Sequence, residues 1–399
     1  LRPPTLPPLN FMHARIRQRQ GLPYSKEVPQ GMAANLRLMQ THEHRLLSRP
    51  DDENALRLAY GAGMASKLVA ELGNDALATK ALRQALHAMA DPQLLSSLLA
   101  AGLIPALNTS VQNKDECLRS LAVQGLSHAA RHPLGLREMV AHASVDVLVV
   151  EPATLADASE EVRRHGLGAV IELARRPEGC RALVGAGAAK VLVERISNES
   201  IELQATALEA LRLLMAQPAG LEDCIREDAL PSLLLRLESP AAEVRKQAAL
   251  ALAAFTAHTP EKIQAGAAAL PPLLSMLGSG DRSVTARCAA SAALMSLTTE
   301  TGCKRAAAEA GGAMVLSTAL SECIEAEGLG EADWGALAVN LLQALAHVAE
   351  HPGARRQLKE RKATARELAL LEGSSDARVR KHAARTGAQI NWAPGANVA

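Results

Sequence analysis

A unit of two helices that recurs along the chain is the feature that most constrains its fold. Residues 229–262 (ALPSLLLRLESPAAEVRKQAALALAAFTAHTPEK) predict a short apolar helix, a polar turn that ends in Pro240, and a longer helix rich in alanine and leucine. Proline ends the first helix because it has no N–H to donate and disfavours helical geometry in the residue before it. Val244, Leu252 and Phe255 mark the inner side of the longer helix, which is apolar almost all round. Such a helix needs neighbours on several sides, and stacked copies of the same unit supply them.

Copies of this unit recur along the chain. The short helices are predicted at residues 101–107, 145–150, 188–196, 229–237, 269–277 and 313–320. The long helices begin with an apolar residue followed by a polar or basic one: Leu118-Arg119, Val162-Arg163, Leu203-Gln204, Val244-Arg245 and Ala286-Arg287. Most long helices end at a turn with proline or glycine, which a third, short helix follows. Three helices in roughly 42 residues are typical of armadillo repeats. HEAT repeats, which have two helices, are the nearest alternative.

The repeats predict an all-α fold, a right-handed superhelical solenoid of about seven armadillo (ARM/HEAT-like) repeats with an extended, proline-rich N-terminal arm. Aromatic residues make up only 2% of the chain, so its core must be built from closely packed alanine and leucine, which suits helices. We expect the arm, with one helix, at residues 1–50, the solenoid at 51–391 and a C-terminal tail at 392–399. Residues 363–391 are predicted to form a partial last unit, whose charges suit a cap that meets water.

Two segments depart from the repeat and are the predicted partner-binding sites. Residues 1–30 carry six of the chain's 20 prolines and form either a disordered tail or an extended arm held on a partner. Residues 322–334 (ECIEAEGLGEADW) insert acidic side chains between the two main helices of the seventh unit, as either a solvated loop or a binding loop. The residues expected to contact partners are Phe11, Arg15, Arg17, Arg19 and Tyr24 in the arm, and Glu325, Glu327, Glu331, Asp333 and Trp334 in the insertion.

Motifs for catalysis and metal binding are weak, so the sequence predicts no enzyme, no cofactor and no metal site. His42 and His44 are two residues apart and cannot lie on one side of a helix. His347 and His351 could share a helix face, but no cysteine or acidic residue follows at ligand spacing, and we expect this pair at the surface. The six cysteines form no Cys-x-x-Cys pair and are expected as small buried hydrophobic residues.

The composition and the long helices also disfavour several binding functions. A net charge of +1 gives no overall attraction to nucleic acid or to an anionic membrane, and the scarcity of aromatics argues against stacking on RNA bases. Armadillo proteins that import nuclear cargo carry a Trp-x-x-x-Asn ladder on their long helices. The corresponding pairs here contain neither residue: Gln124/His128, Gly168/Glu172, Glu209/Leu213, Leu250/Ala254, Ala292/Ser296 and Gln343/His347. A nuclear-import adaptor is therefore disfavoured.

Three segments, residues 59–72, 162–196 and 269–312, resemble the armadillo protein of the radial spokes of motile cilia, the radial spoke head 14 homologue family. The Tyr-Gly sequence at residue 60, the turn at residues 172–179 and the Thr-Thr-Glu-Thr-Gly turn at 298–302 carry most of the likeness. The resemblance covers roughly residues 59–362, as expected for a repeat array, whereas the arm and the acidic insertion depart from the family pattern. The chain is therefore either that protein or a sister armadillo subunit of the spoke.

The resemblance implies a non-catalytic structural or scaffold subunit of the axonemal radial spoke, which joins spoke subunits and supports ciliary or flagellar motility. The implied partners are other radial spoke proteins, together with doublet-microtubule-associated or inner dynein arm proteins, within a large hetero-complex and without nucleic acid or membrane. The implied location is the cytoskeleton of the cytoplasm and the axoneme of the cilium or flagellum. The alternative is a soluble armadillo adaptor that binds an extended peptide in its concave groove.

Overall fold

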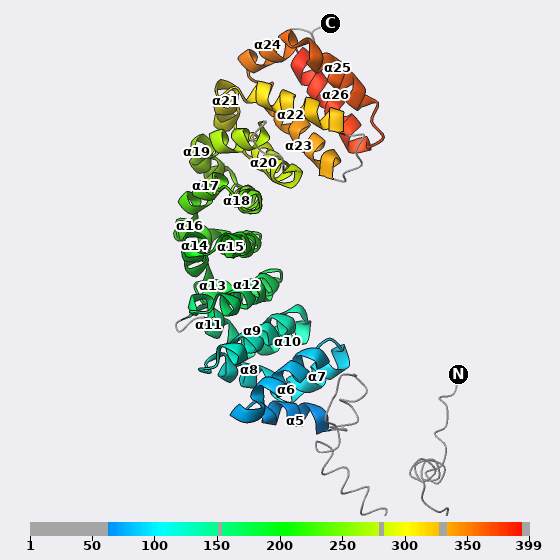
Figure 1. Ribbon diagram of the computed structural model, residues 1–399. Helices are drawn as coiled ribbons and strands as arrows, with labels where there is room; N and C mark the ends of the chain where they lie inside the picture. The colour runs from blue at the N-terminus through cyan, green and yellow to red at the C-terminus, as the bar shows by residue number, and fades with distance from the viewer. Residues whose placement is uncertain (1–62, 151–153, 279–282, 327–332, 393–399) are drawn as a thin grey trace, which may run out of the picture. The chain divides into compact units, whose positions relative to one another are not determined.

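The computed structural model describes residues 63–150, 154–278, 283–326 and 333–392, and every regular element within these ranges is a helix (Figure 1). The predicted all-α class is therefore confirmed. The chain divides into two compact units, residues 1–70 and 71–399. The described part of the first unit holds most of α5 (Met64–Glu71), in which Met64 and Leu68 are buried.

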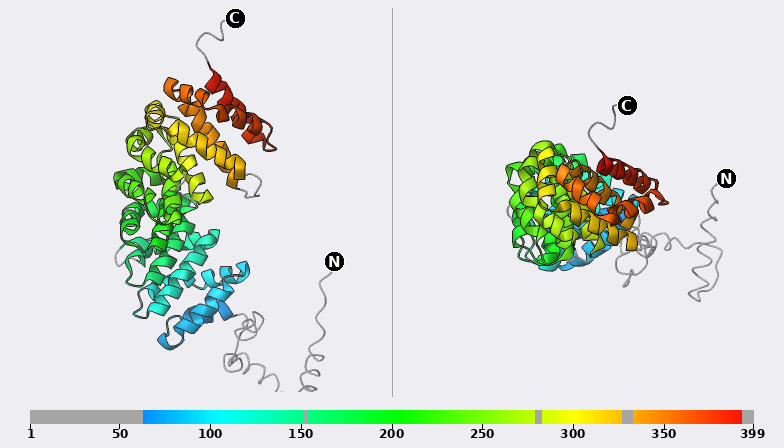
Figure 2. Two further views of the ribbon diagram at one scale, coloured as in Figure 1. Left: turned by 45° about the horizontal axis from the view of Figure 1, so that its top comes forward. Right: turned by 90° about the horizontal axis from the view of Figure 1, so that it is seen from above.

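The second unit is built around a row of long helices, each of which packs against the next along the chain (Figure 1). These helices are α6 (Asp75–Ala88), α9 (Glu116–Arg131), α12 (Glu160–Ala174), α15 (Ile201–Met215), α18 (Ala242–Phe255), α20 (Val284–Leu297), α23 (Asp333–Val348) and α26 (Ala377–Asn391). The rotated views show the same stacking of helices (Figure 2). The predicted starts of the long helices are confirmed, since each apolar–polar pair lies in the first turns of its helix.

Two shorter helices precede each long helix from α9 onward, except α20. The first short helices are α7 (Pro92–Ala100), α10 (Pro133–Ala141), α13 (Pro177–Gly185), α16 (Pro218–Arg226), α21 (Thr301–Glu309) and α24 (Pro352–Glu360). The second short helices are α8 (Leu103–Val111), α11 (Ser144–Val149), α14 (Ala188–Asn198), α17 (Ala229–Leu237), α22 (Gly312–Ala326) and α25 (Lys362–Glu372). In one repeat, the single helix α19 (Thr259–Leu277) takes the place of both, and a 3-10 helix, η2 (Thr154–Ala156), precedes α12.

The described residues thus contain seven successive repeats, which end in α9, α12, α15, α18, α20, α23 and α26. This number agrees with the predicted number of repeats. Residues 363–391 hold α25 and α26, the two helices of the predicted partial last unit, and α24 completes a set of three when the repeat is counted from its first short helix. The sequence start of α24 at Pro352 matches the starts of α10, α13 and α16, which also place proline in the first turn. Proline fits there because the first N–H groups of a helix have no partner within it.

The Pro-x-Gly turns need glycine because they pack closely against the preceding long helix. A Cβ on Gly179 would lie 2.4 Å from the carbonyl oxygen of Leu173, and a Cβ on Gly220 would lie 2.1 Å from that of Leu214. Real side chains do not approach a backbone oxygen so closely, so only glycine fits. The glycine lets each first short helix turn back directly from the end of the long helix.

In most repeats, a residue in the left-handed backbone conformation separates the two short helices. The residue before the second short helix has positive φ in five of them: +88° at Gly102, +53° at Ala143, +75° at Gly187, +50° at Asp228 and +75° at Gly311. This left-handed conformation ends one helix and starts the next at a new angle. In α19 the same position is Ala268, which lies inside a continuous helix. This repeat therefore has one long helix where its neighbours have two.

The arginine at the start of the long helices holds the preceding loop. The Nη1 atom of Arg163 donates to the carbonyl oxygens of Asp157 at 2.8 Å and Ala158 at 3.1 Å, and its other nitrogens donate to both carboxylate oxygens of Glu199, at 2.7 and 2.9 Å. Glu199 precedes α15, so this guanidinium also joins two repeats. Arg119 makes the equivalent contacts, with its ion pair to Asp157 at 2.8 Å. Burial raises the pKa of Asp157, but its hydrogen bonds from Arg119 and Ser159 outweigh this and leave the pKa below its ordinary value.

The core of each repeat is alanine and leucine, as the composition predicted. Val244, Ala248, Leu252 and Phe255 of α18 are all buried. Four cysteines, Cys180, Cys224, Cys303 and Cys323, are buried as expected. Cys117 is exposed, which corrects the expectation for that residue, because it lies in the first turn of α9 beside the loop rather than on the packed side. In the part of the chain that the structure describes, no single helix has the length and apolar composition to cross a membrane, although two bent helix pairs meet those criteria together.

Candidate protein-binding surface

The long helices present one half-exposed side along the whole row, which we call the long-helix face. It is defined by the twelve ladder positions named from the sequence, from Gln124/His128 on α9 to Gln343/His347 on α23, and all twelve are neither fully buried nor fully exposed. This confirms the register of the long helices. The sequence placed these residues correctly because a residue and its fourth neighbour lie on the same side of a helix.

The charges on the first half of the long-helix face pair with one another. Glu172 of α12 lies 3.4 Å from Arg131 of α9 and 3.8 Å from Arg175. Arg175 in turn lies 3.8 Å from Glu209 of α15, which lies 3.9 Å from Arg212. These contacts link three neighbouring long helices. Glu172 and Glu209 each have two arginine neighbours already. Neither carboxylate is therefore left without a cation for a basic peptide to bind.

The second half of the face has fewer charges and more neutral contacts. The amide of Asn340 on α23 donates to the Ser291 hydroxyl on α20 at 3.3 Å, and His347 Nδ1 lies 3.2 Å from the Thr298 hydroxyl. His347 is half-buried, so the expectation that it lies at the surface was wrong: the neighbouring repeat covers it. Burial, with nearby cations such as that of Lys304, holds the pKa of His347 below its ordinary value.

The remaining histidines and acidic side chains do not gather into a metal site. Within the described ranges, no group of three or more His, Cys, Asp or Glu side chains could hold a metal ion. His351 lies at the start of α24 as its N-cap residue. His128 has a lowered pKa, first because it is partly buried and then because Arg131 and His165 are near.

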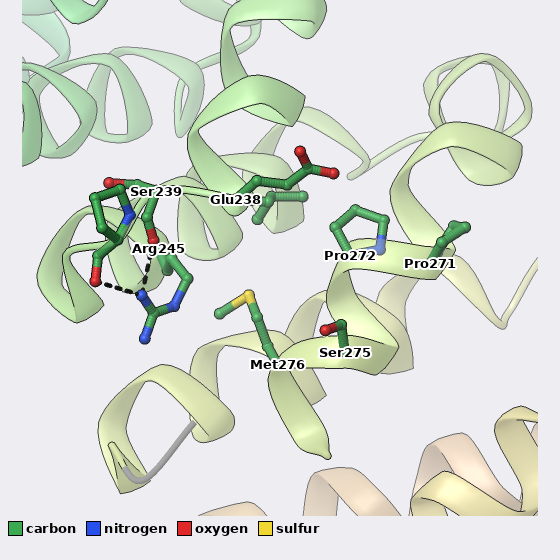
Figure 3. A pocket seen from close by; sticks show the side chains of 9 residues that line it. Glu238, Ser239, Arg245, Pro271, Pro272, Ser275 and Met276 are labelled. Carbon is green, nitrogen blue, oxygen red and sulfur yellow. Dashed lines mark hydrogen bonds between the residues drawn. The ribbon is translucent and has the colours of Figure 1, made fainter. Parts of the chain in front are cut away.

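A pocket of about 690 Å³ lies between the turn that joins α17 to α18 and the helix α19 (Figure 3). It is lined by Leu237, Glu238, Ser239, Pro240, Arg245, Pro271, Pro272, Ser275 and Met276. The Nη1 atom of Arg245 donates to the Ser239 carbonyl at 2.7 Å and to the Pro240 carbonyl at 2.9 Å, so its position is fixed (Figure 3). The described lining has neither histidine nor cysteine. The sequence reasoning missed this pocket, although the Pro-Pro pair inside a helix was a visible signal.

The predicted partner-binding residues are only partly within the described ranges. Phe11, Arg15, Arg17, Arg19, Tyr24, Glu327 and Glu331 lie outside them. Glu325 is exposed near the end of α22, and Asp333 is the first residue of α23. Trp334 is half-buried and lines a small pocket with Cys323, Ile324 and Leu371.

The acidic insertion is helical at both described ends, which corrects the expectation of a loop over the whole of residues 322–334. Residues 322–326 belong to α22, and residues 333 and 334 belong to α23. α22 has 15 residues, whereas the equivalent α14 has 11, so part of the inserted sequence lengthens the helix. Glu322 has a structural contact there, an ion pair of 2.5 Å with Arg287 of the preceding repeat.

The three-helix repeats, the left-handed junctions and the half-exposed long-helix face define an armadillo-repeat solenoid. Solved structures support this fold. A crystal structure of an engineered protein matches with a TM-score of 0.73, 22% identity and 92% coverage of each chain. A designed armadillo repeat protein matches with a TM-score of 0.52 and 24% identity, over 58% of this chain and 99% of the designed one. No family model matches the sequence.

Among curated proteins, the chain is similar to radial spoke protein 14 of Chlamydomonas reinhardtii. The two are 32% identical over 257 residues, which cover 60% of this chain and 65% of that protein. The chain thus matches slightly less than two thirds of the length of this relative. The resemblance to the armadillo protein of radial spokes, inferred from the turns and the order of the repeats, is confirmed by this match.

Proposed function

We propose that the protein is a non-catalytic structural subunit of the axonemal radial spoke that joins other spoke subunits and supports ciliary or flagellar motility. The observation that carries this proposal is the 32% identity to radial spoke protein 14 over 257 residues. The proposed partners are other spoke proteins, together with doublet-microtubule-associated or inner dynein arm proteins. The proposed location is the axoneme of the cilium or flagellum.

The contacts within the solenoid support a scaffold. Solenoid repeats pack only against their neighbours and leave long surfaces accessible to other proteins. Some side chains that could perform chemistry are enclosed by the packing of the repeats: His347 contacts Thr298, and Cys180 and Cys224 are buried. Burial also raises the pKa of the Cys180 thiol, which makes it a weaker nucleophile.

The test is fractionation of isolated axonemes that carry the tagged full-length chain. We expect the protein to remain with axonemes after detergent extraction, to be absent from axonemes that lack spokes, and to crosslink to spoke subunits. Its recovery in the detergent-soluble fraction of spoke-containing cells would contradict the proposal.

We also propose that residues 1–50 form an arm separate from the solenoid at 51–391 and the tail at 392–399, and that the arm and the acidic insertion contact partners. Support comes from the departure of both segments from the repeat. Deleting residues 1–30, or replacing residues 327–332 by a glycine–serine linker of equal length, should lower retention in axonemes. Unchanged retention of both variants would rule these contacts out.

The second candidate, an adaptor that holds an extended peptide on the long-helix face, has one supporting observation. A designed armadillo repeat protein in complex with the peptide (KR)4 shares the fold, with a TM-score of 0.54 and 24% identity, over 58% of this chain and 99% of that one. The paired charges of Glu172 and Glu209 weigh against a basic peptide here. The crosslinking above separates the two functions, since an adaptor would give one short peptide partner and a scaffold several subunits.

A further inference from the structure

The last repeat, α24 to α26, has a charge that differs from the rest of the second unit. Residues 352–391 contain ten Lys or Arg and four Asp or Glu. Residues 71–351 contain 23 Lys or Arg and 33 Asp or Glu. The last repeat is therefore strongly basic, whereas the repeats before it are acidic, although the whole chain has a net charge of only +1.

Six basic side chains of this repeat are exposed and, among the described residues, have no ion pair or hydrogen bond. They form one pair on each helix: Arg356 and Lys359 on α24, Lys362 and Arg366 on α25, and Lys381 and Arg385 on α26. We call these six residues the basic cap. The three helices pack against one another, so the six cations lie within one repeat.

The spacing of these pairs makes the helices less stable, not more. Members of each pair are three or four residues apart, where side chains are neighbours on the helix surface and like charges repel. Elsewhere the chain uses the same spacing for opposite charges: Arg164 lies 2.9 Å from Glu160, and Lys246 lies 2.7 Å from Glu243. A cap that needed only to be soluble could have used such mixed pairs.

The position of the cations along the helices gives an independent argument. Helix N-termini favour negative side chains because the backbone N–H groups there are unpaired. α9, α12, α15 and α18 follow this rule with glutamate in the first turn. α25 has no acidic residue there, and Lys362 is its first residue, whereas α26 has the acidic N-cap Asp376 and Lys359 lies in the last turn of α24, where a cation is favourable. Lys362 is therefore placed against the stability of its own helix.

We propose that the basic cap is a docking surface for an acidic polypeptide segment of a partner protein. Aspartate and glutamate carboxylates accept charge-assisted hydrogen bonds from guanidinium and ammonium groups, and a partner's charge relieves the repulsion within each pair. Leu370 on α25, 65% exposed, adds an apolar contact. This proposal goes beyond the proposed function and does not depend on it.

The charge of the preceding repeats favours a short acidic segment over other polyanions. Interactions between exposed charges are screened beyond about 8 Å at physiological salt. A short segment needs to contact only the last repeat, in which basic side chains outnumber acidic ones. A long nucleic acid or an anionic membrane would extend past the cap toward side chains of its own charge.

The test uses the full-length protein and a fluorescein-labelled oligoglutamate peptide, with binding followed by fluorescence anisotropy at low and physiological salt. The variant Lys362→Gln/Arg366→Gln/Lys381→Gln/Arg385→Gln should bind the peptide about tenfold more weakly or worse. The matched control removes the same charge from exposed sites on other helices, Lys80→Gln/Arg137→Gln/Arg181→Gln/Lys190→Gln. We expect the control to bind within about twofold of the unchanged protein.

Equal loss of affinity in both variants, or no loss in the cap variant, would overturn the proposal. So would tighter binding of the unchanged protein to phosphatidylserine vesicles or to a short DNA duplex than to the peptide. Thermal unfolding of the cap variant provides a further check. An equal or higher melting temperature is expected because like charges are removed, whereas a clear decrease would show that the cations stabilise the repeat and would overturn the argument.

Discussion

Leu252 on α18 has no exposed surface, and its helix packs against both α15 and α20. Replacing Leu252 by alanine should lower the free energy of unfolding by about 2–5 kcal/mol, since it removes buried methyl groups and leaves a cavity. Chemical denaturation measures this change. Leu235→Ala is the control: Leu235 is 60% exposed on α17, and its loss should cost under about 1 kcal/mol. Similar costs for both would mean that the repeats are packed in another register.

Two adjacent arginines on α12 have different environments and therefore make a matched pair. Arg163 binds Glu199, whose side chain is only 1% exposed, whereas Arg164 pairs with glutamates that are largely in water. Arg163→Ala leaves a buried carboxylate without its bidentate partner and should cost about 3 kcal/mol in the free energy of unfolding. Arg164→Ala should cost under about 1 kcal/mol. Equal losses of unfolding free energy in the two variants would show that the contacts of Arg163 with Glu199 and the preceding loop add no stability.

His347 gives the protein a pH dependence with a defined sign. Burial lowers its pKa in the folded state below its ordinary value of about 6.5. As the pH falls, His347 therefore binds a proton in the unfolded chain before it does so in the folded protein. Its contribution to the free energy of unfolding is fully present above about pH 6.5 and decreases as the pH falls from there toward the folded pKa. In His347→Gln, the loss of melting temperature over this range should be smaller. His87→Gln, at an exposed position on α6, is the control, and an equally steep loss in both variants would contradict the assignment.

At this scale the sequence was a good guide to packing and a poor guide to polar contacts. The buried positions of Leu252 and Phe255 follow from helical spacing alone. The partners of Arg163 and His347 do not, because Glu199 and Thr298 belong to neighbouring repeats. Contacts between repeats depend on how the helices cross, and a single sequence does not state that angle.

Among the helices, α19 is the element that departs from the pattern. Five of the other repeats begin their second short helix after a left-handed residue, but the equivalent Ala268 lies inside α19 and is exposed. Ala268→Gly should therefore destabilise the protein by about 1 kcal/mol, as glycine does in a helix interior. Gly187→Ala, at the equivalent junction, should also destabilise by about 1 kcal/mol because alanine disfavours its φ of +75°.

The sign of the Ala268→Gly effect decides between one helix and two, and denaturation of both variants measures it. If residue 268 adopted the left-handed conformation of Gly187, glycine would stabilise the protein instead. The sequence alone predicted the helix at residues 269–277 but not its union with the preceding one. The alanine at residue 268, where several other repeats have glycine, was the sequence signal for a continuous helix. This signal can be recognised only by comparing residue 268 with the equivalent residues of the other repeats.

The insertion at residues 322–334 shows a second limit at the scale of elements. Its acidic composition and its glycines suggested a loop, yet Glu322 to Ala326 continue α22. Glutamate and alanine are good helix formers, so a helix already anchored by packing continues through them. The candidate contacts in the arm and at Glu327 and Glu331 remain predictions.

For the whole second unit, the number of repeats and their order could be predicted because the same signals recur seven times. Stability in such an array is approximately a sum of repeat terms and neighbour interfaces. Three interfaces carry an ion pair from a long helix to the next repeat: Arg119–Asp157, Arg163–Glu199 and Arg287–Glu322. At the corresponding position of α15 stands Gln204, which accepts a hydrogen bond of 3.4 Å from Arg236.

This substitution has a mechanical consequence. In a protein pulled from its two ends, force passes through the interfaces in series, so the weakest one yields first. Gln204 stands in place of the arginine at the interface between α15 and the repeat that ends in α18, so we expect this interface to yield at a lower force than the interface between α12 and α15, which has the Arg163–Glu199 ion pair. Single-molecule pulling with cysteine-coupled handles on either side of each interface would measure both forces. Arg163→Gln should bring the two forces close together, and an unchanged difference would contradict this account. The chain would then behave as a spring whose joints differ in stiffness.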